Sequence, residues 1–148
     1  MGVTMASEKI FSAFVGEDPK LTLWHGHSFT GNPLGCAAAN ASLDLLEESP
    51  EKYQEFESRH LPFLKELEQH PLVKNIRVCG TIAAFDIKVK DTAGYLNNAG
   101  RSLKASALKD GVFLRPLGNV VYLLPPLCIN DSQLKQCYIA IKRGLDTL

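Results

Sequence analysis

Two pairs of short strand-like runs constrain the fold of this chain more than any other feature. Residues 73–89, VKNIRVCGTIAAFDIKV, contain two runs rich in β-branched residues that are broken at Cys79-Gly80. The runs VFLRP (112–116) and NVVYLLPP (119–126) form a second pair, broken around Leu117-Gly118-Asn119. Because such short connections favour neighbouring antiparallel strands, we expect a small, mostly antiparallel sheet.

Segments with helical spacing precede, separate and follow these strand pairs. We expect helices from near Asn32, with Thr30 or Asn32 as the cap, over 49–70, over 94–111 and over 130–148. Ser49 is the expected cap of the second helix, which Pro62 is expected to kink or interrupt, and Gly111 should end the third. This order of helices and strands predicts a mixed α/β fold, organised as an α+β domain with helices packed on one face of the sheet.

Composition excludes several classes of function. At 148 residues and 45% hydrophobic content, the chain is long enough for one domain with a core. The 16 basic and 16 acidic residues cancel, so we expect no nucleic-acid partner and no anionic membrane surface. The apolar runs are too short for a membrane span and the N-terminus has no signal pattern.

The cysteines and histidines give no metal-ligand spacing. Cys36, Cys79, Cys128 and Cys137 form no CxxC pair, and most lie among apolar or small residues, so we expect buried free thiols in a reducing cytoplasm. Since no Cys or His pair is backed by a second pair, we expect no metal site.

The loop WHGHSFTGNPLG, residues 24–35, concentrates hydrogen-bonding groups ahead of a helix. A Ser-His nucleophile is disfavoured because the loop lacks a Gly-x-Ser-x-Gly turn. An anion site fits better, since a glycine-flanked loop leaves backbone N–H groups free and the helix N-terminus favours negative charge. The competing interpretation is that these are ordinary turn and capping residues.

Arg115 is the second candidate, because its guanidinium lies in the otherwise apolar run VFLRPLG. The planar guanidinium matches a carboxylate or phosphate through two hydrogen bonds. From the residues alone, an arginine that reaches solvent or pairs with a nearby aspartate is the favoured interpretation. Tyr122 is by the same reasoning a core or edge aromatic. His60 occupies the apolar stripe of the second helix, yet we interpret His60 and His70 as surface residues.

Two motifs resemble one enzyme family. HGHSFTGNPLGCAAANASLDLLE resembles the loop-and-helix segment of class III, pyridoxal-phosphate-dependent aminotransferases. LRPLGNVVYLLPPLCI resembles the C-terminal motif of one branch, the adenosylmethionine-8-amino-7-oxononanoate aminotransferases of biotin synthesis. VCGTIAAFDI and PLCINDSQL follow the same pattern, so the resemblance extends over nearly the whole chain.

The resemblance implies the C-terminal domain of a fold-type I transferase with pyridoxal 5'-phosphate as cofactor. It implies a cytoplasmic homodimer that moves an amino group from S-adenosylmethionine to a keto acid, 8-amino-7-oxononanoate, giving 7,8-diaminononanoate. Residues 1–30 would be the end of the large cofactor-binding domain with its phosphate-contacting loop, and residues 31–148 the small C-terminal domain.

The resemblance also implies roles for particular residues. His27 and Ser28 match the positions that bind the cofactor phosphate, and in the family's dimer this is the cofactor of the neighbouring subunit. Gly26 matches a position beside the keto substrate. Arg115 matches the arginine that holds the substrate carboxylate, and Tyr122 a tyrosine near the substrate. Many members of the family have Thr at the position of Ser28, which keeps the hydroxyl. Because the position of His27 is occupied by either His or Pro, we expect residue 27 to contact the cofactor through its backbone.

The family's Schiff-base lysine would lie upstream of MGVTMAS, so we expect no catalytic residue in this chain and no complete reaction by the chain alone. Two alternatives stay open. The chain could come from another class III transaminase that acts on an omega-amino acid or a diamine, or it could be a stand-alone, non-catalytic binding or dimerisation module.

Overall fold

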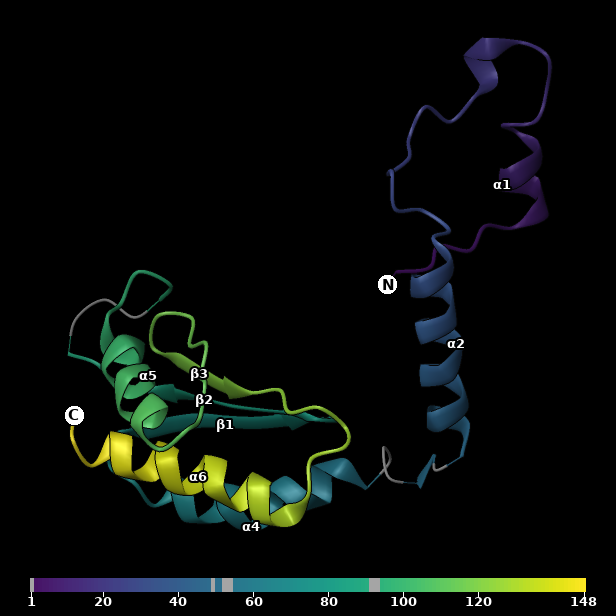
Figure 1. Ribbon diagram of the computed structural model, residues 1–148. Coiled ribbons are helices and arrows are strands. Elements are labelled where there is room, and N and C mark those ends of the chain that lie inside the picture. Colours follow the sequence, from purple (N-terminus) through teal and green to yellow (C-terminus); the bar gives the residue numbers. More distant parts are fainter. Residues whose placement is uncertain (1, 49, 52–54, 91–93) are drawn as a thin grey trace. The chain divides into compact units, whose positions relative to one another are not determined.

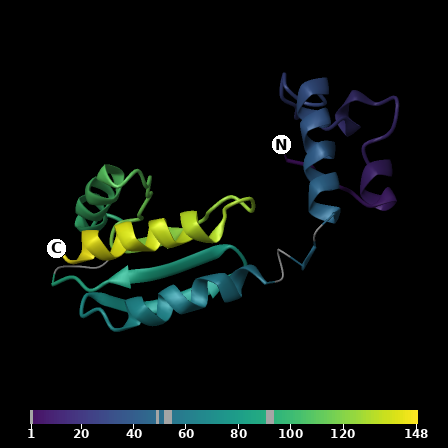
Figure 2. The same cartoon turned by 60° about the horizontal axis from the view of Figure 1, so that its bottom comes forward.

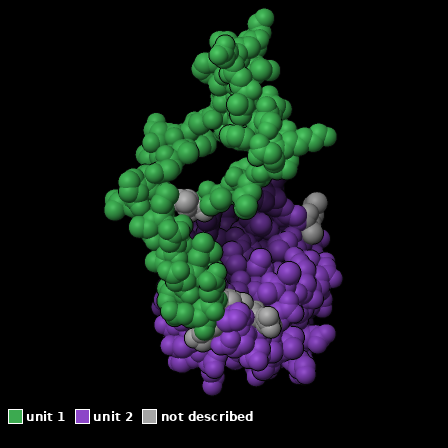
Figure 3. All heavy atoms as spheres, turned by 90° about the vertical axis from the view of Figure 1, so that its right-hand side faces the viewer, with its two compact units in different colours: residues 1–49 green, residues 50–148 purple. Residues whose placement is uncertain are grey.

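The computed structural model of the chain describes residues 2–48, 50–51, 55–90 and 94–148. The chain divides into two compact units, Met1–Ser49 and Pro50–Leu148, which are drawn in different colours in Figure 3.

Unit 1 contains the helices α1 (Glu8–Ser12) and α2 (Pro33–Glu47) and the 3-10 turn η1 (Pro19–Leu21) (Figure 1). The expected cap of α2 is confirmed as Asn32, whose side chain accepts a hydrogen bond from the Gly35 N–H at 2.7 Å. None of the described residues of unit 1 is buried. Unit 1 therefore has helices but no hydrophobic core of its own.

Unit 2 is built on a three-stranded antiparallel sheet in the order β1 (Val73–Cys79), β2 (Ile82–Ile87), β3 (Val120–Leu123). The break at Cys79-Gly80 is the expected hairpin turn, since Cys79 pairs with Ile82 and Gly80 has a φ of +55°. The register also places Ala84 opposite Tyr122.

The prediction of a strand at 112–116 is wrong. Val112 and Leu114 are buried while Phe113 is 65% exposed, so the run has the alternation of a strand. That alternation arises because an extended segment inserts every second side chain into the core, without a ladder to a neighbouring strand. Only Leu117, next to the run, forms a bridge, to Val120 across the turn.

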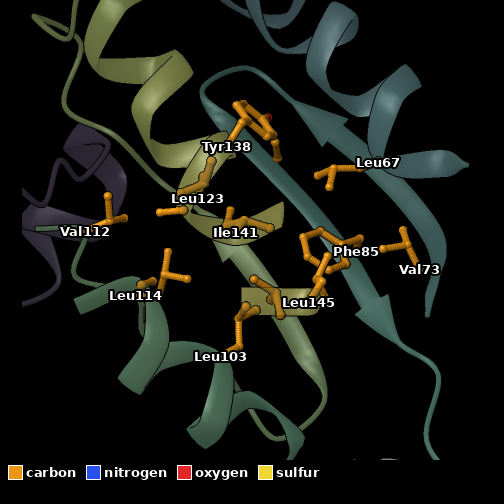
Figure 4. Packing of buried hydrophobic residues seen from close by; sticks show 14 of the residues in the cluster. Leu67, Val73, Phe85, Leu103, Val112, Leu114, Leu123, Tyr138, Ile141 and Leu145 are labelled. Atoms are coloured by element: carbon orange, nitrogen blue, oxygen red, sulfur yellow. The ribbon is translucent and has the colours of Figure 1, made fainter. Parts of the chain in front are cut away.

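The helices α4 (Phe56–Glu68), α5 (Ala99–Lys109) and α6 (Asp131–Leu145) pack on one face of this sheet (Figures 1 and 2). Side chains from all these elements meet in one core, where Phe85 of β2 lies near Ile141 and Leu145 of α6 (Figure 4). The predicted α+β architecture, with a small antiparallel sheet covered by helices on one face, is confirmed.

The helix boundaries differ from the prediction in several places. The structure assigns α4 from Phe56, and the expected cap Ser49 lies outside the described residues. α4 continues through Pro62, so the expected interruption does not occur. α5 begins at Ala99 rather than at residue 94. The left-handed glycine expected after α5 is confirmed, with Gly111 at a φ of +76°, and Asn130 caps α6 in a capping box.

His60 is not a surface residue. Its ring is fully buried, with Nε2 lying 3.1 Å from the Thr81 carbonyl oxygen and Nδ1 2.6 Å from the Tyr138 hydroxyl. The apolar stripe of α4 carries His60 into the core, where these two partners satisfy both ring nitrogens. His70 is half-buried and lies 3.3 Å from an Asp146 carboxylate oxygen.

The cysteines are free, as expected, but they are not buried. Cys79 and Cys128 are exposed, and Cys36 and Cys137 are half-buried. The apolar sequence around them does not decide their exposure, because Cys128 lies in a loop and Cys79 at the end of an edge strand.

Candidate functional site

The glycine-, serine- and histidine-containing loop lies in unit 1 between η1 and α2. Its turn at Ser28–Gly31 is closed by a hydrogen bond from the Thr30 N–H to the His27 carbonyl, at 3.0 Å. The His27 N–H in return donates to Thr30 Oγ1 at 3.3 Å. Gly31 has a φ of +68°, a conformation that glycine adopts at little cost. Thr30 therefore stabilises the loop, and Asn32 caps the helix.

These internal bonds leave Ser28 free. Within the described part of the chain, neither its backbone N–H nor its hydroxyl forms a hydrogen bond, and the residue is exposed. Gly26 is exposed as well, and a Cβ added to it would meet no atom within 4 Å. The loop thus combines both predicted features, turn residues that hold its shape and donors that stay available to an anion.

Arg115 and Tyr122 lie in unit 2 and are brought together by its fold. The β3 neighbours of Tyr122, Val121 and Leu123, are buried in the core, so the Tyr122 side chain extends from the opposite face of the sheet. Arg115 lies in the extended segment before the turn that leads into β3 and is exposed. The two residues line the same two hollows of the surface.

The larger hollow has a volume of about 660 Å³ and is mainly apolar. Beside Arg115 and Tyr122, its wall includes the aromatic ring of Phe113 and the residues Pro125 and Pro126 that follow β3. A volume of this size accommodates a small organic molecule. The hollow therefore offers an apolar wall with a guanidinium and a phenol at its margin.

The smaller hollow has a volume of about 380 Å³ and lies between the N-terminal part of α5 and the turn before β3. Its wall carries the side chains of Arg101 and Lys104 in addition to Arg115. No aspartate or glutamate is among the described residues that line it. This hollow is therefore strongly positive.

Arg115 has no partner among the described residues. The arginines that do form ion pairs, Arg59, Arg77 and Arg143, each lie within 3.3 Å of an aspartate oxygen. Burial alone would raise the pKa of Asp86, but hydrogen bonds from Asn75 and Arg77, with the charges of Arg77 and Lys74, hold that pKa below its usual value. Of the two expected interpretations of Arg115, pairing with a nearby aspartate is not found in the described part of the chain, whereas the exposed side chain agrees with an arginine that reaches solvent.

Arg101 and Lys104 were not among the candidates from the sequence. They are three residues apart on α5, a spacing that places two side chains on the same face of a helix. The sequence spacing therefore indicates that the two side chains share one face of α5, but not that this face lies beside Arg115.

Other classes of site find no support in the described residues. Among the residues placed by the structure, no group of three or more His, Cys, Asp or Glu side chains could hold a metal ion. In the same part of the chain, every helix is too short or too polar to cross a membrane.

Comparison with known proteins identifies the family. The family model for class-III aminotransferases matches residues 1–145. The chain belongs to the class-III aminotransferases. The enzymes of this family depend on pyridoxal 5'-phosphate, so the predicted family and cofactor are confirmed at this level.

The relatives of this class-III chain include enzymes of one pathway. Over all 148 residues the chain is 47% identical to the adenosylmethionine-8-amino-7-oxononanoate aminotransferase of Synechococcus elongatus, of which it covers 35%. It is 36% identical to the enzyme of the same name from Geobacter sulfurreducens, of which it covers 34%. The chain therefore spans about a third of the length of these curated relatives.

Solved structures of class-III enzymes show the same fold. The adenosylmethionine-8-amino-7-oxononanoate aminotransferase of Methanocaldococcus jannaschii superposes with a TM-score of 0.77 at 32% identity, over 93% of this chain and 34% of the other. An omega transaminase from Pseudomonas jessenii superposes with a TM-score of 0.73 at 29% identity, over 85% of this chain and 29% of the other.

Proposed function

We propose that this chain is part of an aminotransferase of biotin synthesis. The whole enzyme transfers the amino group of S-adenosylmethionine to 8-amino-7-oxononanoate and produces 7,8-diaminononanoate. The identity of 47% to the Synechococcus elongatus relative, along the full length of the chain, supports this substrate pair. The observation that carries the proposal is the guanidinium of Arg115, unpaired within the described residues, at the margin of an apolar hollow.

Arg115 binds the carboxylate of the keto acid. An arginine and a carboxylate form two parallel hydrogen bonds, which fix the direction of the acid as well as its position. The aliphatic part of the acid lies along the apolar wall that includes Phe113 and Pro125. The Tyr122 hydroxyl is available in the same hollow for a polar contact near the substrate.

The loop of unit 1 fits the phosphate of the cofactor. Ser28 supplies a free hydroxyl and a free N–H, both suited to a phosphate oxygen. His27 contributes its backbone N–H, which exchanges its 3.3 Å hydrogen bond to Thr30 Oγ1 for the phosphate oxygen. Gly26 lets a ligand approach the backbone closely, beside the keto substrate. Pyridoxal phosphate, when bound, supplies the electron sink that lets an amino group pass between two carbon skeletons.

The division of the whole enzyme follows the family. We propose that residues 1–30 complete the large cofactor-binding domain and residues 31–148 form the small C-terminal domain. The whole enzyme is a cytoplasmic homodimer in which the Gly26–Ser28 loop serves the cofactor of the neighbouring subunit. The structure's own division at Ser49 separates units by compactness, which is a different criterion.

A chimaera tests the proposal. Residues 1–148 replace the matching third of the Synechococcus elongatus relative, and turnover of 8-amino-7-oxononanoate with S-adenosylmethionine is measured. We expect an active, yellow enzyme in which Arg115→Lys lowers kcat/KM for the keto acid about 10- to 100-fold, because a lysine cannot form the paired hydrogen bonds. The cofactor absorbance should not change.

Arg143→Lys is the matched control, since Arg143 lies on α6 and pairs with Asp110 outside both hollows. Equal kinetics for the Arg115 variant and the unchanged chimaera would refute the role of Arg115. A folded chimaera that binds the cofactor but does not use S-adenosylmethionine would refute the substrate assignment.

A second candidate is an omega transaminase, which the structural similarity to the Pseudomonas jessenii enzyme supports. It differs from the first in its amino donor. The same chimaera is therefore assayed with beta-alanine, ornithine and 4-aminobutyrate beside S-adenosylmethionine. A preference for one of these donors would favour the second candidate.

A further inference from the structure

The smaller hollow holds more positive charge than a single arginine requires. Arg101, Lys104 and Arg115 all line a space of about 380 Å³. None of them takes part in an ion pair with a described residue. Like charges that converge without an acidic partner repel one another, and a bound anion removes that cost. The hollow is therefore built for an anion rather than for structural pairing.

Neutral groups around the cations suit an organic acid. Asn98 and Tyr122 add polar side chains to the wall, while Leu96 and Leu117 add apolar surface. The ammonium of Lys104 lies 5.0 Å from the centre of the Phe113 ring, a cation–π contact that favours this position of the side chain. Because the cations surround a small hollow, and the chain as a whole has no net charge, the site suits a small anion rather than nucleic acid.

The backbone fixes where α5 lies relative to Arg115. The Gly100 N–H at the start of α5 donates to the Gly118 carbonyl at 3.0 Å. A Cβ at Gly100 would collide with that carbonyl and lie 2.6 Å from Pro116. A Cβ at Gly118 would collide with the Gly94 carbonyl. Close glycine contacts thus bring the residues after Gly100 next to the segment that carries Arg115.

The buried Asn119 reinforces this arrangement. Its side-chain oxygen accepts from the Gly94 N–H at 2.8 Å, and its amide donates to the Ile87 carbonyl at 3.0 Å. The turn before β3, the segment before α5 and the end of β2 are therefore tied together. The positions of Arg101 and Lys104 follow from a backbone framework and not from flexible surface loops alone.

We propose that Arg101 and Lys104 complete the carboxylate subsite of Arg115 and determine its preference for an acid that ends in a carboxylate on an aliphatic chain. This inference rests on the proposed function and deepens it. Arg115 makes the paired hydrogen bonds, and the two α5 cations add attraction for the negative end. The aliphatic carbons lie along the apolar wall of the larger hollow, which shares Arg115 and Tyr122 with the smaller one.

The test is a titration of the 148-residue chain with nonanoate, followed by NMR of the arginine Nε–H groups. Nonanamide, which has the same chain without the charge, is the ligand control. We expect saturable shifts for Arg115 and Arg101 with nonanoate only. Arg101→Gln and Lys104→Gln should each weaken binding up to about fivefold, as expected for one exposed charge interaction. Arg101→Lys should retain most of the affinity.

Lys109→Gln is the matched control, because Lys109 lies on the same helix but does not line the hollow. It removes one positive charge and should leave the affinity unchanged. Amide spectra of every variant show whether unit 2 is still folded. Loss of affinity in a folded Arg101→Gln or Lys104→Gln variant, with none in Lys109→Gln, supports the inference.

Other results overturn it in distinguishable ways. If Arg115→Gln abolishes binding but the α5 variants bind normally, the inference is wrong and the role of Arg115 remains. If Arg115→Gln binds normally, the carboxylate role in the proposed function is wrong as well. Inorganic phosphate that binds more tightly than nonanoate at the same residues would assign the subsite to phosphate. An absence of saturable binding by the unchanged chain would contradict both assignments.

Discussion

The environment of His60 determines the protonation state of its ring. The Thr81 carbonyl 3.1 Å from Nε2 can only accept, so Nε2 carries the proton and Nδ1 accepts from the Tyr138 hydroxyl at 2.6 Å. Burial, together with the nearby charge of Arg59, lowers the pKa of His60 below its ordinary value. The Tyr138 ring also stacks on Phe63, with centroids 4.7 Å apart. This polar pair is thus satisfied inside an apolar core.

Removal of the Tyr138 hydroxyl should destabilise unit 2. In Tyr138→Phe the buried Nδ1 of His60 loses its donor, and we expect the free energy of unfolding to fall by about 1–3 kcal/mol. Urea denaturation measures the change. Tyr122→Phe is the control, because the half-buried Tyr122 hydroxyl forms no hydrogen bond with the described residues, and it should change stability by less than about 0.5 kcal/mol. Equal effects of both variants would contradict this prediction.

The lowered pKa of His60 has a consequence for acid stability. Below about pH 6.5 the unfolded histidine binds a proton, while the folded one stays neutral until the pH reaches its lower folded pKa. The stability of unit 2 should therefore decline through this window as the pH falls. Denaturation curves between pH 7 and pH 5 measure the decline, which should be shallower in His60→Gln. An unchanged slope in that variant would contradict the assignment.

At the scale of elements, the glycine contacts between α5 and the turn before β3 are the most sensitive feature. Gly118 has a φ of +63°, and an added Cβ would collide with the Gly94 carbonyl. Gly118→Ala should therefore lower the free energy of unfolding by about 1 kcal/mol through strain in the left-handed backbone conformation, and by about 1–3 kcal/mol more through overpacking. Thermal or urea unfolding measures the sum.

Gly111→Ala separates the two contributions. Gly111 has a similar φ of +76°, but a Cβ there would meet no atom within 4 Å. In this variant only the backbone strain should lower the free energy of unfolding, so it should be clearly more stable than Gly118→Ala. If the two variants unfold at the same urea concentration, the close contact at Gly118 does not contribute.

Local signals in the sequence predicted some elements correctly and others not. Asn32, Asn130 and Gly111 act as caps because side-chain oxygens and left-handed glycines bind orphan groups within the same few residues. The strand expected at 112–116 was wrong because a ladder depends on a distant partner, which an alternating pattern does not reveal. The helix through Pro62 shows the same limit, since the packing of α4 outweighs one lost hydrogen bond.

The candidate site shows the same division between local and distant information. Family motifs indicated Gly26, His27 and Ser28, together with Arg115 and Tyr122, and the fold brings the last two together at two hollows. Arg101 and Lys104 were missed, because their approach to Arg115 depends on backbone contacts between residues far apart in the chain. The burial of His60 likewise depends on Tyr138, 78 residues away.

At the scale of the whole molecule, the two units differ in how they are stabilised. Unit 2 has a continuous core, whereas Trp24 and Leu34 of unit 1 are 81% and 85% exposed. Helices without tertiary packing are marginal in water. The free energy of unfolding of the chain should therefore come almost entirely from unit 2.

Limited proteolysis tests this difference. A protease of broad specificity should cleave unit 1 first and leave a resistant fragment that begins near Pro50. A protein made of residues 50–148 should then have the same urea midpoint as the full chain. Equal cleavage rates in the two units, or a large loss of stability in the shorter protein, would show that unit 1 contributes to the fold.

At the positive hollow, glycine backbone contacts set the position of α5, and separate residues supply the charged side chains. The distance between α5 and the segment of Arg115 depends on main-chain contacts at Gly100 and Gly118. The groups proposed to face the ligand, in contrast, are side chains at positions 101 and 104, which are not part of the core. If the proposal holds, mutation at these two positions alters which acids bind without disturbing the fold. Single substitutions at these two positions therefore give access to other ligand preferences, whereas an added Cβ at Gly100 or Gly118 collides with the backbone of the framework itself.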